Sequence, residues 1–154
     1  MADLILNEAL GRSLVEIQAV EDNSPAAATI DIRAWVISAA DESLRDAADR
    51  QVTTFEAITN VTEATPYTIQ LMDETDITIL VDDTNNRADV TFVDQTFTSV
   101  AAQTAWTDIT LSYDADGTPS GTDLIFDVFD FSVTPNGGDI TVDFPAVSHR
   151  YVQA

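Results

Sequence analysis

The residues best suited to chemistry are acidic and surround one glycine turn. The run Asp-Ala-Asp-Gly at 114–117, followed by Asp123, begins in the way that calcium-binding loops begin. A helix-loop-helix calcium site would add a third ligand before the glycine and a bidentate Glu at the end of the loop, and neither occurs. The pattern, with Pro119 inside it, fits a plain hairpin turn better. We expect no metal and no cofactor, and the candidate ligands, should a cation bind, are Asp114, Asp116 and Asp123.

Catalytic constellations are missing from the sequence. His149 is the only histidine, there is no cysteine, and no serine stands in a sharp glycine-flanked elbow where a base could activate it. Paired carboxylates cannot be singled out among 27 acidic residues. We therefore predict that the protein is not an enzyme, that it has no catalytic residues, and that His149 is an exposed or interface residue near the chain end.

The charge balance excludes further classes of function. Six arginines face 27 acidic residues and there is no lysine, so the net charge is −21. Binding to nucleic acid needs clustered Lys and Arg, and a phosphate loop needs a glycine-rich pattern that is absent here. No apolar run approaches the ~18 residues of a membrane span, and an acid at Asp3 replaces the basic start of a secretory signal. We expect no nucleic-acid or membrane partner and synthesis in the host cytoplasm.

The elements that must position these residues are mostly strands in one domain covering 1–154. Apolar residues spaced by fours predict a helix over 41–58, and a possible N-terminal helix lies within 4–20. β-branched alternation bounded by turn residues predicts strands at 29–37, 67–72, 76–81, 87–93, 107–113, 123–131 and 139–144. The connections after Pro66 are too short for crossover helices, so we predict an antiparallel β-sandwich or small barrel.

An aromatic run near the C-terminus breaks the regular alternation. In a regular strand Phe126 and Val128 would share a face with Asp130, which predicts either a bulge or an edge exposed to a partner. The residues that we assign to a candidate interface are Phe126, Phe129, Phe131, Val147, Tyr151 and Val152.

Most of the chain resembles a family of small virion structural proteins of tailed phages. The resemblance is carried by the runs 111–117, 121–125 and 129–142 in the C-terminal half, by 82–90 and 94–98 in the middle, and by 23–26 and 44–46 in the N-terminal half. It implies a non-enzymatic virion component, a head decoration or cement protein bound to the major capsid protein. Neck or tail positions are the alternatives within the same class.

The acidic composition and the resemblance to virion proteins are both consistent with a virus of a salt-adapted host. A surface this acidic is tolerable in brine, where salt screens the repulsion, which indicates a halophilic host and thus a haloarchaeal tailed virus. We expect a homo-oligomer within the virion, in contact with the major capsid protein or other virion proteins. The competing class is a cation-dependent binding or adhesion module.

Folding stability should depend steeply on salt. The Debye length shrinks from about 30 Å at 0.01 M to about 3 Å at 1 M ionic strength, so repulsion within the folded chain weakens over this range. We expect the thermal unfolding midpoint, followed by circular dichroism, to rise markedly from dilute buffer to molar KCl. A midpoint that stays flat would remove the argument for a halophilic host.

Overall fold

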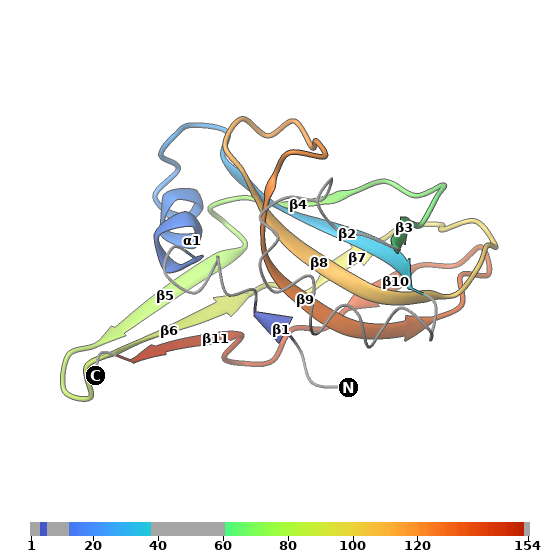
Figure 1. Cartoon of the computed structure of the whole chain (residues 1–154). Coiled ribbons are helices and arrows are strands. Elements are labelled where there is room, and N and C mark those ends of the chain that lie inside the picture. Colours follow the sequence, from blue (N-terminus) through green and yellow to red (C-terminus); the bar gives the residue numbers. More distant parts are fainter. Residues whose placement is uncertain (1–3, 6–12, 38–60, 153–154) are drawn as a thin grey trace.

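The computed structural model describes residues 4–5, 13–37 and 61–152 (Figure 1). In these ranges the chain is mainly β, with antiparallel sheets, one helix and no closed barrel, which confirms the predicted fold class. The predicted helix over 41–58 lies outside the described residues. The elements, in chain order, are β1 (Leu4–Ile5), α1 (Ser13–Glu21), β2 (Thr29–Ile37), β3 (Val61–Glu63), β4 (Gln70–Met72), β5 (Ile77–Asp82), β6 (Arg87–Phe92), β7 (Gln95–Phe97), β8 (Trp106–Asp114), β9 (Leu124–Val133), β10 (Ile140–Val142) and β11 (His149–Val152).

The largest sheet is built on the long antiparallel pair β2 and β8. Its order is β1-β9-β8-β2-β3, and β4 also pairs with β2. The pairing of β2 with β8 separates the side chains by polarity, because residues directly opposite each other project to the same face. One face carries the apolar pairs Ile30–Tyr113, Ile32–Leu111 and Ala34–Ile109, and the other carries Thr29–Asp114, Asp31–Ser112, Arg33–Thr110 and Trp35–Asp108.

Two smaller sheets complete a sandwich-like arrangement. They are the three-stranded sheet β11-β6-β5 and the two-stranded sheet β10-β7. Their buried residues, among them Phe92, Phe97 and Val142, belong to the same core as Ile32 and Leu111 of the largest sheet. The apolar face of that sheet is therefore covered by the smaller sheets.

The N-terminal part of the chain agrees only partly with the predicted helix. In α1, Ile17 and Val20 are buried, and Asn23 ends the helix in the left-handed conformation (φ 50°) that terminates many helices. Leu4 and Ile5 are not helical: they pair with Val128 and Asp127 of β9. Local apolar spacing cannot reveal a pairing with a strand so distant in sequence. No helix within the described ranges has the length and apolar character needed to span a bilayer.

The irregularity predicted in the aromatic run is confirmed. The pairing of β8 with β9 shifts register between Leu111, opposite Asp127, and Ser112, opposite Ile125, so that Phe126 is the extra residue. The strand is not an edge, because β9 lies between β1 and β8. The bulge turns Phe126 into the core, where it is fully buried. Phe126 is thus unavailable to a partner, which corrects its assignment to the interface.

Replacing Gly117 should destabilise the protein more than replacing Gly137. Both have positive φ (70° and 99°), but a Cβ on Gly117 would stand 2.7 Å from the backbone oxygen of Ala27, whereas one on Gly137 would meet nothing within 4 Å. We expect Gly117→Ala to lower the free energy of unfolding by about 2–4 kcal/mol and Gly137→Ala by about 1 kcal/mol. Chemical denaturation measures both, and equal losses would show that the contact with Ala27 is unimportant.

Candidate functional site

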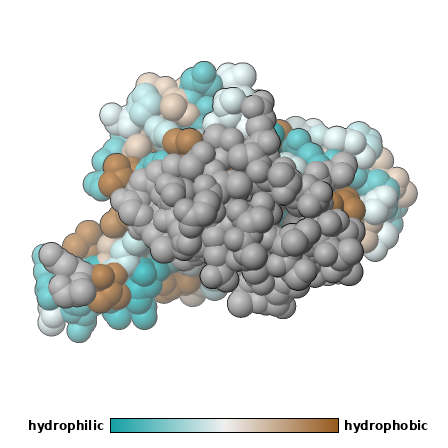
Figure 2. Space-filling view, in the orientation of Figure 1, coloured by the Kyte–Doolittle hydropathy of each residue, from teal (hydrophilic) through white to brown (hydrophobic). Residues whose placement is uncertain are grey.

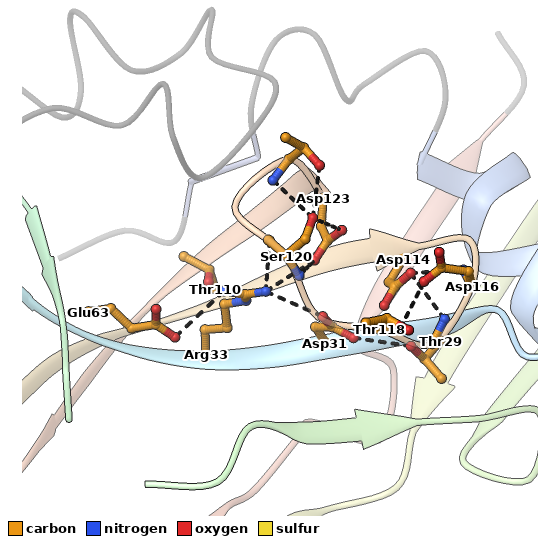
Figure 3. A network of polar contacts seen from close by, with 12 residues as sticks. Thr29, Asp31, Arg33, Glu63, Thr110, Asp114, Asp116, Thr118, Ser120 and Asp123 are labelled. Atoms are coloured by element: carbon orange, nitrogen blue, oxygen red, sulfur yellow. Dashed lines mark hydrogen bonds and ion pairs between the residues drawn. The ribbon is translucent and has the colours of Figure 1, made fainter. Parts of the chain in front are cut away.

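Three buried carboxylates converge at one end of the polar face of the largest sheet (Figure 3). Asp31 lies on β2, Asp114 is the last residue of β8, and Asp123 directly precedes β9. Each offers an oxygen within 4.8 Å of the oxygens offered by the other two. The three residues are only 0%, 3% and 8% exposed. We call this group the aspartate cluster.

The turn at 114–123 holds two of the carboxylates in place. The Oδ1 atom of Asp114 accepts the backbone N–H groups of Asp116 at 2.8 Å and Gly117 at 3.1 Å. At the other end of the turn, Asp123 accepts the backbone N–H of Ser120 through Oδ2 at 2.5 Å and its hydroxyl through Oδ1 at 2.9 Å. The turn therefore closes on itself and brings its two ends to Asp31.

Arg33 supplies positive charge on one side of the aspartate cluster. Its Nη2 donates to the backbone oxygen of Ser120 at 2.7 Å and to Oδ2 of Asp123 at 3.1 Å. The same nitrogen lies 3.7 Å from Oδ2 of Asp31, beyond hydrogen-bond distance. Nη1 lies 3.7 Å from Oε1 of Glu63. Arg33 thus neutralises Asp123 most directly and the other two carboxylates less.

Two carboxylate oxygens of the aspartate cluster have no hydrogen-bond partner in the described structure. Asp31 Oδ1 accepts the Thr29 hydroxyl at 3.1 Å, but Asp31 Oδ2 and Asp114 Oδ2 are buried without a hydrogen-bond partner in the described structure. Burial and the charge of Asp114 raise the pKa of Asp31 to about 7, and burial also raises the pKa of Asp114. Ionisation of these two carboxyl groups in the folded chain therefore has an electrostatic cost.

The structure brings together two of the three residues suggested by the sequence. Asp114 and Asp123 meet in the cluster, whereas the Oδ1 of Asp116 points to the turn itself and accepts the backbone N–H of Thr118 at 2.9 Å. Sequence reasoning missed Asp31 and Arg33. A signal was present, because Asp31 and Arg33 alternate with apolar residues in a strand that is buried from Thr29 to Trp35.

His149 is not an exposed or interface residue, as was predicted, but a buried one. Its Nε2 lies 2.7 Å from Oδ2 of Asp127, and both side chains are almost fully buried. The imidazole packs edge-on against Phe92, with a ring-centroid distance of 5.5 Å, and stacks on Tyr151. The prediction failed because β11, which pairs with β6, was not recognised as a strand. The pair links β11 to β9 within the core.

The remaining candidate interface residues fall into two groups. Phe129, Phe131 and Tyr151 are partly buried and pack against the core. The Tyr151 hydroxyl is also within hydrogen-bond distance of Ser13 Oγ, at 2.9 Å. Val147 and Val152 are exposed. Of the predicted set, the two valines are thus the residues most open to a partner.

Removing the histidine of the buried pair should be costly. His149→Leu would leave the buried Asp127 carboxylate without its imidazole partner, and such losses amount to about 3–5 kcal/mol. The neighbouring Arg150 is a matched control, because it pairs with Asp89 at 2.6 Å but is exposed. We expect Arg150→Leu to change the free energy of unfolding far less. Similar losses from both substitutions, measured by denaturant unfolding, would contradict this assignment.

Comparison with known proteins identifies no relative. Protein-family models, curated proteins and solved structures all give no match to this chain. The function of the described residues must therefore be argued from their own geometry.

Proposed function

We propose that this protein is a non-enzymatic structural component of a tailed-virus particle, a decoration protein that binds the capsid shell. The observation that carries the proposal is an apolar strip on the sheet β11-β6-β5 that continues from the core to an exposed end. The resemblance to small virion proteins supports the same class, and neck or tail proteins of such a particle are the runner-up.

The strip follows from strand register. Cross-strand neighbours share a face, so the row Ile79–Val90–His149 and the row Val81–Ala88–Tyr151 lie on the same side of the sheet. The first row contains the buried Val90 and His149. The second row lies one step further out, and there Val81 is 72% exposed. The apolar face therefore does not end where the core ends.

The outer part of this sheet forms an arm. In Figure 1, β5, β6 and β11 run out together from the body of the molecule, and Figure 2 shows hydrophobic side chains at that end. A pocket of about 320 Å³ there has both apolar and polar lining residues, which are Leu14 of α1, Val81, Ala88, Tyr151 and Val152 together with Asp83, Asn86 and Arg87. Leu80 and Val152 are also exposed, at 61% and 65%, but the register places them on the opposite face of the arm. The strip that continues from the core therefore ends at Val81, and exposed apolar residues that continue a core in this way mark a contact surface.

Apolar contact suits the proposed setting. Salt screens exposed ion pairs, and a chain with six arginines has few to offer. Burial of apolar surface, by contrast, persists in concentrated salt. A stable pairwise complex buries about 800 Å² on each partner, whereas the exposed part of the strip is formed chiefly by Val81. The proposal therefore includes many identical copies on a symmetric shell, where repeated weak contacts add up.

Incorporation into particles should depend on the exposed strip. Val81→Asp places a charge in the strip at a position that is already exposed, so the isolated chain should stay folded while its incorporation falls at least tenfold. Thr78→Asp is the matched control, because Thr78 is an exposed residue of the same strand but points to the opposite face. Mass spectrometry of purified virions measures both variants.

Two outcomes would reject the proposal. One is the absence of the wild-type chain from purified particles when it is present in extracts of infected cells. The other is equal incorporation of Val81→Asp and wild type, which would show that the strip contacts no virion partner.

A further inference from the structure

We propose that the aspartate cluster is a calcium site, in which Asp31, Asp114 and Asp123 supply carboxylate oxygens and Ser112 supplies a hydroxyl oxygen. The inference is independent of the virion assignment, because it concerns the isolated chain. It starts from the convergence of three buried carboxylates from two strands and the residue that precedes a third.

The aspartate cluster carries a net negative charge. Among the described residues, its three carboxylates and the Arg33 guanidinium give a formal charge of −3 + 1 = −2. Arg33 is already engaged by Ser120 and Asp123, and its other nitrogen faces Glu63. A buried charge is tolerated when it is paired or coordinates a metal. One divalent cation would neutralise the remainder.

An unsatisfied hydroxyl, that of Ser112, lies on the same face of the sheet as the aspartate cluster. Ser112 is directly opposite Asp31 in the β2–β8 pairing and two residues before Asp114 on β8, so its side chain lies on the face of the cluster. Ser112 is 0% exposed, and its Oγ has no hydrogen-bond partner in the described part of the chain. Buried hydroxyls are normally hydrogen-bonded. A bound cation would give an acceptor oxygen at this position a partner.

The carboxylate oxygens without hydrogen-bond partners also support a bound cation. In Asp31 and in Asp114, Oδ1 is held by a protein donor while Oδ2 is left without one. This division fixes each carboxylate through one oxygen and leaves the other available to a ligand. Asp123, held by Ser120 and Arg33, would use a remaining lone pair. The turn that anchors Asp114 and Asp123 thus orients them before an ion arrives.

The ligand set favours calcium over magnesium. Ca²⁺ accepts about six to eight oxygens in flexible geometry, whereas Mg²⁺ demands near-ideal octahedral geometry, loses its water reluctantly and is seldom held by protein oxygens alone. The cluster is buried and its carboxylate oxygens lie within 4.8 Å of one another, so it suits the ion that accepts protein oxygens in place of water. A shared proton is the competing way to relieve the repulsion, and it would need no ion.

Calcium should raise the unfolding midpoint of the wild-type chain. At constant molar KCl, Ca²⁺ at about one hundred times its dissociation constant should raise the midpoint by about 5–10 °C relative to EDTA. Titration calorimetry should show one ion per chain, and Mg²⁺ at the same concentration should give a smaller shift.

Isosteric variants separate a bound ion from a shared proton. Asp31→Asn and Asp114→Asn should abolish the calcium shift, and in EDTA Asp31→Asn should be more stable than wild type because it removes repulsion. Asp116→Asn is the control and should keep the full shift, since Asp116 is outside the cluster. No binding heat and no shift for wild type would overturn the proposal in favour of a shared proton. An equal shift in Asp31→Asn would show general screening, and an equal shift with Mg²⁺ would overturn the assignment to calcium.

Discussion

The structure depends on burying both faces of the β2–β8 pair when only one of them is apolar. Every residue from Thr29 to Trp35 is buried, so the charged groups of the polar face are not solvated by water. Charged groups in such a place are costly unless they are paired and hydrogen-bonded. The turn at 114–123 and Arg33 meet this requirement in part. The cost that remains is offset by the apolar face, where the smaller sheets complete a single core.

Local patterns predicted the elements that are long and regular. The strand at 29–37 was predicted with its observed bounds, and the other six predicted strands each overlap an observed one, because alternation over several residues is a strong signal. An irregularity in the aromatic run was also predicted, as either a bulge or an exposed edge, because a regular strand would place Phe126 and Val128 on one face with Asp130. The structure has the bulge. Short strands were not predicted: β3, β7 and β11 have three or four residues each, too few for a clear alternation, and they form by pairing with the distant strands β2, β10 and β6.

The candidate site was predictable only where it is local in sequence. Asp114 and Asp123 belong to one turn, so their proximity could be anticipated from the glycine between them. Asp31 joins them through the register of β2 against β8, and no pattern within either strand specifies that register. The same holds for His149 and Asp127, whose contact requires β11 to pair with β6 and β9 to bulge. Tertiary pairing, which a single sequence does not reveal, decides both sites.

The two proposals share one physical origin. A chain with 27 acidic residues and six arginines cannot rely on exposed ion pairs for adhesion or for rigidity, least of all in concentrated salt. Two kinds of interaction do not depend on exposed ion pairs. Contact between apolar surfaces is strengthened by salts that are excluded from protein, and a divalent ion held by buried carboxylates is shielded from monovalent competitors by its site. The exposed strip of the arm can provide the apolar contact, and the aspartate cluster can hold the divalent ion. The strip lies on β5, β6 and β11, and the cluster lies on β2, β8 and the turn before β9, so the two share no residue and can be tested by separate substitutions.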